Sequence, residues 1–239
     1  YLSDIRYVPR VQTRNGIANP RFIPPGTQLK IPIRWLKLEP APAKIFSFVG
    51  QVQLISATGQ NQTLSESLIG QTLLQSGDRI ETGADSSITL EFADGSRFQL
   101  RQNSTLELDA LSTYGNTGMV DTRMRLQRGR INGQVQPERG ADTRYEIATP
   151  AATASVRGTD YRLNADTSLL RAEVIEGSVR IASTGGARLL ARGQGSLTEA
   201  GRAPQPPRPL LTPPQIDVDM RRIERIPIQL SWQALNGAV

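Results

Sequence analysis

Residues 88–109 read ITLEFADGSRFQLRQNSTLELD, and apolar residues alternate with polar ones in three short runs. The runs are Ile88–Phe92, Arg97–Arg101 and Thr105–Asp109. Alternation with a period of two places every second side chain on one face of an extended strand, which predicts three half-buried β-strands. Asp94-Gly95 separates the first two runs, and both residue types favour positive φ in a tight hairpin turn. We therefore expect consecutive strands to pair.

The same alternation of apolar and polar residues extends from residue 45 to residue 201. Short alternating runs are separated there by glycine-containing turn signals, and no segment shows helical periodicity over the length of a helix. The composition agrees, because 21 Gly and 16 Pro with only 5% aromatic residues favour short strands and tight turns. Parallel strands joined by helical crossovers are not expected. We predict a mostly β fold, either an antiparallel β sandwich or a short β stack.

Residues 1–35 have a different pattern. Ile5, Val8 and Val11 recur at helical spacing, and Asn15-Gly16 suits the left-handed residue that ends a helix. A loop with prolines follows, and residues 28–32 read as a strand. The predicted order is helix, loop, strand.

The run NGIANPRFIPPGTQLKIP at residues 15–32 resembles the second half of a LysM domain. The resemblance implies a small α/β remnant, in which the loop before the last strand forms one wall of a glycan groove. The residues that it implies for glycan binding are Ile17, Ala18, Asn19, Pro20 and Ile23. Residues 1–35 lack the front half of such a module, and the chain begins with Tyr1 rather than Met, so we expect a fragment of a longer protein.

Two proline-rich segments mark expected boundaries. Residues 36–44 and 202–214 read as semi-rigid, extended spacers. Beyond them, residues 226–232 (IPIQLSW) alternate like the first strand of an immunoglobulin-like domain, with Trp232 as a core residue. The expected organisation is a LysM-like remnant at 1–35, a linker at 36–44, a β domain at 45–201, a linker at 202–214 and the first strand of a following domain at 215–239.

Ordered blocks across roughly residues 50–200 resemble the FecR domain. They are SGDRIETG at 76–83, LEFADGS at 90–96, LQRGRI at 126–131, YEIATP at 145–150, ASVRGTDY at 154–161 and VIEGSV at 174–179. We interpret the blocks as structural, because their glycines allow special backbone conformations and their polar side chains satisfy turn amides. The structural motif residues are Gly77, Asp78, Gly83, Asp94, Gly95, Ser96, Gly129, Thr149, Gly158, Thr159, Glu176 and Gly177. The alternative interpretation is a site formed by Asp94, Ser96, Thr159 and Asp160.

The composition argues against several classes of chemistry. The chain has no Cys and no His, which removes the usual ligands of zinc, copper and iron and the usual proton shuttle at neutral pH. We expect no metal, no cofactor and no catalytic residues. The net charge of +6 arises within residues 1–44, which hold eight Lys or Arg against Asp4 and Glu39. A nucleic-acid binder would carry a basic stripe with aromatic residues on its folded body, so none is expected here. No uninterrupted apolar run is long enough for a membrane span.

The FecR resemblance implies a periplasmic or outer-envelope location in a Gram-negative bacterium. Founding members of that family relay a signal from an outer-membrane iron receptor to a sigma factor, with an anti-sigma segment and a membrane helix in front of the domain. Here a LysM-like piece stands in front. The main expectation is therefore a non-enzymatic binding or scaffolding protein, whose partner is an envelope protein or peptidoglycan. The first alternative is an envelope signal-transduction regulator, and the second is a glycan-active enzyme on a β scaffold. The identity of the partner and the oligomeric state stay open.

Overall fold

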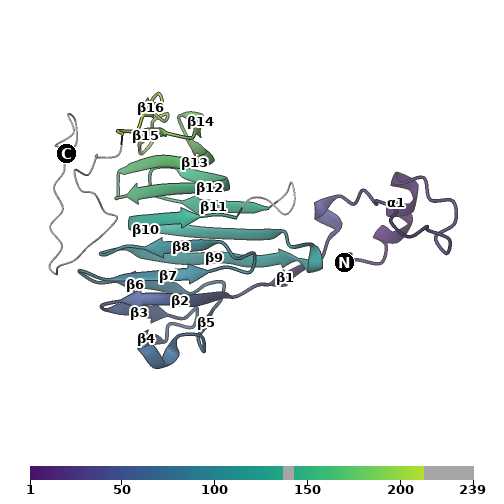
Figure 1. Cartoon of the computed structure of the whole chain (residues 1–239), viewed down its shortest axis with the longest axis horizontal. Helices are drawn as coiled ribbons and strands as arrows, with labels where there is room; N and C mark the ends of the chain where they lie inside the picture. Colours follow the sequence, from purple (N-terminus) through teal and green to yellow (C-terminus); the bar gives the residue numbers. More distant parts are fainter. Residues whose placement is uncertain (137–142, 213–239) are drawn as a thin grey trace, which may run out of the picture.

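The computed structural model describes residues 1–136 and 143–212, and its strands lie side by side in a tall stack (Figure 1). The elements in chain order are α1 (Tyr7–Arg14), η1 (Ile33–Trp35), β1 (Leu38–Pro40), β2 (Ala43–Val49), β3 (Val52–Ile55), β4 (Asn61–Thr63), η2 (Glu66–Leu68), β5 (Leu73–Leu74), β6 (Arg79–Thr82), β7 (Ser87–Glu91), β8 (Arg97–Leu100), β9 (Thr105–Tyr114), η3 (Gly115–Thr117), β10 (Val120–Gln134), β11 (Arg144–Ala148), β12 (Thr153–Ala165), β13 (Leu169–Ser183), β14 (Gly186–Ala191), β15 (Gln194–Glu199) and β16 (Arg208–Pro209). The predicted mostly β fold is confirmed.

Hydrogen bonding joins the strands into one sheet of 16 strands, which the strand registers divide into two layers. Layer one runs β4-β3-β6-β9-β10-β11-β12-β13-β14, with β1 beside the end of β9. Layer two runs β5-β2-β7-β8-β10-β12-β13-β15-β16. Strands β10, β12 and β13 belong to both layers, because each is long enough to bend from one into the other.

Each of the three long strands bends at a glycine with positive φ. In β10, residues up to Arg128 pair with β9 and residues from Gly129 pair with β12, and φ of Gly129 is 101°. Gly158 in β12 (φ 50°) and Gly177 in β13 (φ 76°) divide their strands in the same way. Only glycine adopts such values without a steric cost, so these three motif glycines set the places where the layers meet.

Four crossings between the layers lie along one edge. They occur at Gly50, at residues 83–86, at residues 101–104 and at Gly129. Buried hydroxyl groups connect successive crossings: Gln51 N–H donates to Ser86 Oγ at 2.9 Å, Ser104 N–H to Thr82 Oγ1 at 3.0 Å, and Arg130 N–H to Ser104 Oγ at 3.0 Å. Ser104 thus satisfies the backbone N–H of Arg130 at a crossing through its hydroxyl.

The space between the layers holds the hydrophobic core. Both layers contribute alternate residues, such as Ile88 and Leu100 from layer two and Leu106 and Ile147 from layer one, all at most 1% exposed. One aromatic cluster sits near the edge opposite the crossings, where Phe98 packs edge to face against Tyr145 at 5.3 Å between ring centroids. Packing of this kind adds to the free energy that burial supplies.

One strand pair is parallel, contrary to the antiparallel sandwich expected from the sequence. β11 runs parallel to the first half of β10, with Asp121 opposite Arg144. The cause is the bend at Gly129: the second half of β10 returns in layer two, so the chain re-enters layer one at the end where β10 began. No helical crossover is therefore needed.

The Asp94-Gly95 hairpin exists, but its turn differs from the predicted one. Gly95 has φ 84°, whereas Asp94 does not adopt positive φ. Phe92 N–H donates to the Ser96 carbonyl at 2.9 Å, which closes a longer loop than a two-residue turn. The Asp94 side chain accounts for the difference, because its Oδ1 accepts the Ser96 N–H at 3.0 Å and its Oδ2 accepts the Ser96 hydroxyl at 2.8 Å.

The N-terminal unit, residues 1–37, projects from one side of the stack (Figure 1). The predicted helix is α1, and it ends as predicted, with Asn15 as its C-cap and Gly16 at φ 64°. The predicted strand at residues 28–32 is wrong, because that segment pairs with no neighbouring strand. The backbone of Lys30 instead bonds to the Asn15 amide, which accepts from Lys30 N–H at 2.7 Å and donates to the Lys30 carbonyl at 3.1 Å.

Both proline-rich segments differ from free spacers where the structure describes them. Residues 36–44 include β1 and the start of β2, and Ala43 is fully buried. In residues 202–212, β16 pairs with β15, and Gln205 N–H donates to the Leu197 carbonyl at 2.9 Å. The predicted strand at 226–232 lies outside the described residues. Within residues 1–136 and 143–212, no helix is long and apolar enough to span a bilayer.

Candidate functional site

The outer face of layer two carries a cluster of arginines. We name as the arginine face the outward side chains of β8, β10, β12 and β13 together with the residue that follows β8. The arginine face comprises Gln99, Arg101, Arg130, Asn132, Arg162, Asn164, Arg171 and Glu173. Successive side chains of a strand point to opposite faces of the sheet. These residues therefore point outward, while their neighbours Leu100, Ile131 and Leu163 point into the core.

The strand registers align these side chains in rows across the sheet. In one row, Arg101 N–H donates to the Arg130 carbonyl, and Arg130 stands opposite Asn164, which stands opposite Arg171. In the next row, Gln99 is opposite Asn132, followed by Arg162 and Glu173. Neighbouring strands lie about 4.8 Å apart, so each row brings residues distant in sequence within the reach of one extended ligand.

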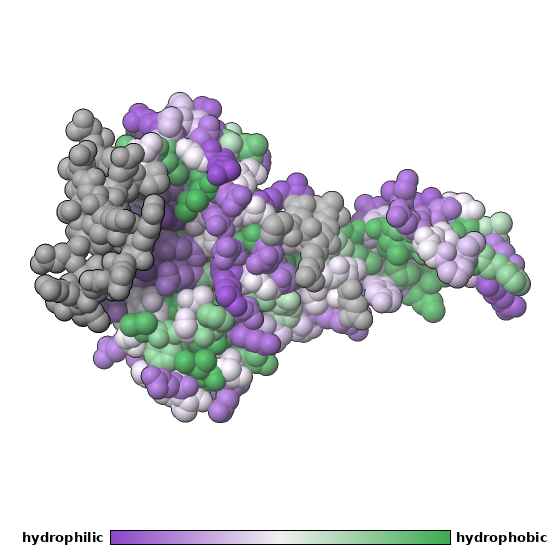
Figure 2. Space-filling model, in the orientation of Figure 1, coloured by the Kyte–Doolittle hydropathy of each residue, from purple (hydrophilic) through white to green (hydrophobic). Residues whose placement is uncertain are grey.

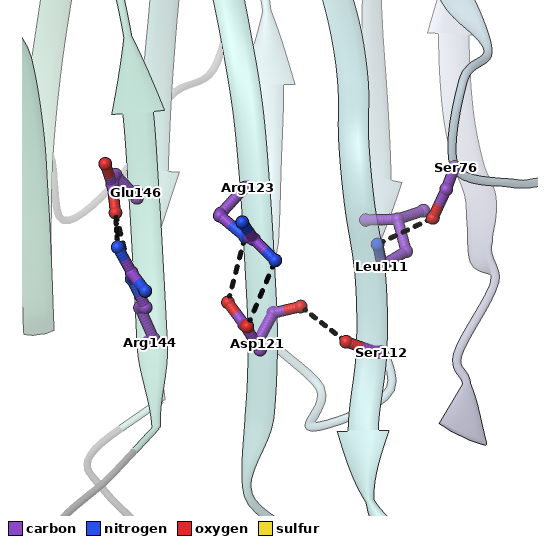
Figure 3. Close-up of polar contacts among 7 residues, drawn as sticks. All are labelled: Ser76, Leu111, Ser112, Asp121, Arg123, Arg144 and Glu146. Atoms are coloured by element: carbon purple, nitrogen blue, oxygen red, sulfur yellow. Dashed lines mark hydrogen bonds and ion pairs between the residues drawn. The ribbon is translucent and has the colours of Figure 1, made fainter. Parts of the chain in front are cut away.

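The two outer faces differ in how their arginines are compensated. On layer one each of several arginines has a carboxylate: Arg125 lies 3.1 Å from Glu107 and 3.2 Å from Asp109. Figure 3 shows Arg123 directed at both oxygens of Asp121, and Arg144 paired with Glu146. The Glu146 carboxylate raises the pKa of Arg144. The layer-one face therefore holds internally neutralised pairs.

Asp121 is the one buried carboxylate of that face. Its backbone carbonyl accepts the Ser112 hydroxyl at 3.2 Å, and on the neighbouring strand Leu111 N–H donates to Ser76 Oγ at 2.8 Å (Figure 3). The Arg123 guanidinium is 3.4 Å from Asp121 Oδ1. The Ser112–Asp121 bond joins β9 to β10, and the Leu111–Ser76 bond joins β9 to the loop between β5 and β6, so we assign these contacts a structural role.

On the arginine face, compensation is sparse. Arg162 lies 3.7 Å from Glu173, a long ion pair. Arg101 donates to the Gln99 amide oxygen at 3.4 Å. Within the described part of the chain, Arg101, Arg130 and Arg171 form no ion pair with a carboxylate. Exposed guanidinium groups that lack partners attract carboxylates or phosphates and bind them with paired hydrogen bonds.

Shallow cavities connect along this surface. One of about 450 Å³ is lined by Arg101, Arg130, Asn132, Arg162, Asn164 and Arg171, and also by Leu163 and Glu173. A second, of about 390 Å³, extends it toward Arg97 and Ile175. A third, of about 480 Å³, shares Arg162, Arg171 and Glu173 and lies beneath residues 205–211. A partner that follows the rows would thus find a continuous track of cationic and amide groups.

Comparison with known proteins finds one family model that matches the central part of the chain. Residues 78–180 match the model of the FecR protein family. The FecR match includes the four arginines of the arginine face and most of the motif glycines. It bears out the FecR resemblance and does not reach residues 15–32, so the LysM resemblance has no support from it. No curated protein matches the chain.

Two solved structures are similar to part of the chain. Both are crystal structures of a proposed anti-sigma factor from Parabacteroides distasonis, at 2.50 Å and 1.65 Å resolution, with 12% and 13% identity and TM-scores of 0.46 and 0.44. In each comparison, 55% of this chain and 59% of the other chain are covered. The chain therefore spans less than two thirds of those proteins.

Most FecR motif residues stand at bends or turns, and not in one site. Gly129, Gly158 and Gly177 are the bends described above. Thr149 Oγ1 donates to the Ala152 carbonyl at 2.7 Å, and Asp78 accepts the N–H groups of Gln75 and Ala57 at 2.8 and 3.1 Å. Glu176 is exposed next to Gly177. Gly77 (φ 93°) and Gly83 lie at the turns beside β6.

The alternative site of Asp94, Ser96, Thr159 and Asp160 is divided in the structure. Asp94 and Ser96 bind each other and Tyr145, whose hydroxyl donates to Asp94 at 2.6 Å. Burial and the Asp94 carboxylate raise the pKa of Tyr145. Thr159 Oγ1 instead donates to the Ser178 carbonyl at 2.9 Å, at the bend of β12. No hydrogen bond joins the two pairs within the described residues.

The residues implied for glycan binding lie in the loop of the N-terminal unit. Asn19 Oδ1 accepts Arg21 N–H at 3.0 Å, which forms a turn, and Ile23 is 38% exposed beside the 80% exposed Phe22. Figure 2 shows hydrophobic surface on this unit next to hydrophilic residues. Ile17, Ala18 and Pro20 lie in the same loop. Their role in glycan binding stays a prediction.

Sequence reasoning missed the arginine face. The signal was present in the alternation of Arg, Gln and Asn at outward positions of the predicted strands, as in Arg97–Arg101. Its meaning depended on which strands become neighbours, which the sequence does not state. Among the described residues, no group of three His, Cys, Asp or Glu is arranged to hold a metal ion.

Proposed function

We propose that this chain is the binding domain of a cell-envelope signal-transduction regulator, without enzymatic activity of its own, and that its arginine face receives an acidic surface of a partner protein. The FecR match over residues 78–180 supports a regulatory role. The family resemblance implies a periplasmic location and a partner in the envelope.

The observation that carries the proposal is the contrast between the two outer faces. On layer one, Arg123, Arg125 and Arg144 each face a carboxylate, whereas on layer two Arg101, Arg130 and Arg171 have no ion pair among the described residues. Uncompensated charge on one face raises the association rate with an oppositely charged partner and selects against other partners.

The test places a photo-crosslinking amino acid at two positions of one strand, one on the outer face of each layer. Asn164 and Ser155 both lie on β12, the first on the arginine face and the second on the outer face of layer one. After expression in a Gram-negative host, we expect periplasmic protein and a crosslink from Asn164 to an envelope protein. The crosslink should disappear with Arg130→Glu and should be absent from Ser155. Cytosolic protein, or equal crosslinking from both positions, would contradict the proposal.

A second candidate function is tethering to peptidoglycan through the N-terminal unit. The observation that favours it is the loop of residues 17–26, in which Phe22 is 80% exposed. We name as the Asn15 clamp the two hydrogen bonds between the Asn15 amide and the Lys30 backbone, which join the segments on either side of this loop. Sedimentation with purified sacculi tests it, with Asn19→Ala and Phe22→Ala as variants. Retention that is equal for these variants and the unchanged chain would count against this loop.

The absence of an enzymatic activity is tested separately. Purified protein is incubated with peptidoglycan and with acidic polysaccharides. We expect no new reducing or unsaturated ends, because no pair of carboxylates faces a deep cleft in the described residues. Appearance of such ends would restore the enzyme alternative.

A further inference from the structure

The third cavity of the arginine face differs from the other two, because it combines cationic and apolar walls. Arg162, Arg171 and Arg208 supply the positive charge, and Glu173 is the one carboxylate among the described lining residues. The apolar part consists of Ala172, Leu197, Pro206, Pro209, Leu210 and Leu211. A volume of about 480 Å³ accommodates one or two side chains of a peptide rather than a single ion.

The cavity roof is a proline-rich strap, residues 205–211, which is fixed at both ends. At one end Gln205 N–H donates to the Leu197 carbonyl at 2.9 Å, and the Ser196 hydroxyl donates to the Gln205 carbonyl at 2.8 Å. At the other end Leu210 N–H donates to the Gly193 carbonyl at 2.8 Å. Prolines in the strap reduce its freedom, so the wall is preformed.

One outward position in the floor of the cavity has no side chain, which allows the strap to lie close to the sheet. Gly195 stands between Glu173 on β13 and Arg208 on β16 in the strand register. A Cβ at Gly195 would lie 3.1 Å from Leu210 Cδ2 and 3.6 Å from Glu173 Cγ. The absence of a side chain at Gly195 thus lets Leu210 of the strap pack directly against the sheet.

We propose that this cavity binds an apolar anchor residue of an extended acidic peptide, whose flanking carboxylates lie on the arginine rows. The proposal rests on the proposed function and names the element that the partner presents. Charge complementarity supports an anionic occupant, and the leucine and proline walls support an apolar side chain beside the charges. The amides of Asn132 and Asn164 can bind the peptide main chain along the track.

A peptide fits better than a polysaccharide. Sugar rings and nucleobases are commonly bound by stacking on exposed aromatic side chains. Among the described residues, the three cavities have one aromatic lining residue, Tyr161, which is buried at 1% exposure. The lining instead combines guanidinium groups, amides and aliphatic side chains.

The test measures fluorescence anisotropy of two fluorescein-labelled octapeptides with the full chain at low salt. Both carry six glutamates, and they differ in having two central leucines or two central serines. We expect the leucine peptide to bind about tenfold more tightly, because a partly buried leucine side chain supplies about that factor. Equal affinity of the two peptides would overturn the proposal that the cavity binds an apolar anchor residue. It would leave the proposal of an acidic partner unaffected. Failure of both peptides to bind would overturn the anchor and the proposed function together.

Two pairs of variants locate the binding. Leu211→Asp changes a 54% exposed lining residue, and Leu189→Asp changes a 64% exposed residue of β14 outside the cavity, so neither should unfold the domain. Leu211→Asp should abolish the preference for leucine, and Leu189→Asp should retain it. Arg171→Glu should weaken both peptides by about tenfold or more, whereas Arg180→Glu, on the layer-one half of β13, should not.

Competition separates the peptide from other anions. Polygalacturonate and laurate are titrated against the bound leucine peptide. Displacement by polygalacturonate at lower concentration than the unlabelled peptide, with no effect of Leu211→Asp, would assign the face to a polysaccharide and overturn the proposal. Displacement by laurate that is lost in Leu211→Asp but unchanged in Arg171→Glu would assign the cavity to a fatty acid. That outcome would also overturn the proposal.

Discussion

The hydroxyl of Tyr145 donates a 2.6 Å hydrogen bond to Oδ1 of Asp94, and the two residues are separated by 51 positions in the sequence. Tyr145 lies on β11 of layer one, and Asp94 lies in the hairpin between β7 and β8 of layer two. The bond therefore joins the layers at the edge opposite the hydroxyl-linked crossings. Ser96 extends the connection, because its Oγ accepts Gln136 N–H at 3.0 Å.

Removing the Tyr145 hydroxyl tests this link. Tyr145→Phe should lower the free energy of unfolding by about 1–3 kcal/mol, because the half-buried Asp94 loses a donor. Tyr161→Phe is the matched control, since the buried Tyr161 hydroxyl has no hydrogen-bond partner in the described structure and its loss should cost little. Chemical denaturation measures both. Equal losses for the two variants would contradict the role of the Tyr145–Asp94 bond.

The same two tyrosines predict the response to alkali. Burial raises the pKa of Tyr145 and of Tyr161 above the ordinary value of 10.0. A group whose pKa is raised by folding stabilises the native state fully below its unfolded pKa, and this contribution is lost as pH rises above about 10 toward the folded pKa. Phenolate absorbance should therefore show that these two tyrosines ionise only with unfolding. Full ionisation of all tyrosines in still-folded protein near pH 10 would contradict this.

The bends of the long strands predict a difference between two glycines. A Cβ at Gly177 would lie 2.3 Å from the Gly158 carbonyl oxygen, whereas a Cβ at Gly95 would meet no atom within 4 Å. Both have positive φ, at 76° and 84°. Gly95→Ala should cost about 1–2 kcal/mol from the backbone conformation alone. Gly177→Ala should cost about 3 kcal/mol or more, because a rigid backbone overlap is added.

Thermal unfolding of these two alanine variants gives the comparison. The order of the two melting temperatures is the decisive readout, since the backbone cost is common to both. A Gly177 variant as stable as the Gly95 variant would show that the bend relaxes without cost. That outcome would contradict the role of the close approach between Gly158 and Gly177 in forming the bends of β12 and β13.

The Asn15 clamp predicts that the N-terminal unit loosens independently of the β body. Asn15→Ala removes the two side-chain hydrogen bonds to Lys30, and trypsin should then cut faster after Arg21 and Lys30. The unfolding midpoint of the β domain should stay unchanged, because the clamp makes no contact with layer one or two. Thr13→Ala serves as a control, since its hydroxyl bonds only within the helix. Equal proteolysis of both variants would contradict the clamp.

The alternation of residues 88–109 predicted three strands, and β7, β8 and β9 confirm them, because a strand is defined by local periodicity. The helix stop at Asn15-Gly16 was predictable for the same reason. The turn at Asp94 was not, because its side chain bonds to Ser96 and to a tyrosine on a distant strand. The predicted strand at 28–32 failed because a strand needs a neighbour, which local pattern does not supply.

The sequence by itself determined the class of this protein: a chain of alternating strands with glycine bends, without the Cys and His that most metal or acid–base chemistry requires. Tertiary structure alone decided where its charge gathers. Arg130, Arg162 and Arg171 come from three strands and Arg101 directly follows a fourth, and only the register between those strands aligns them on one face. The physical reason is that side-chain direction follows from a local period of two, whereas strand neighbours depend on how the whole core packs.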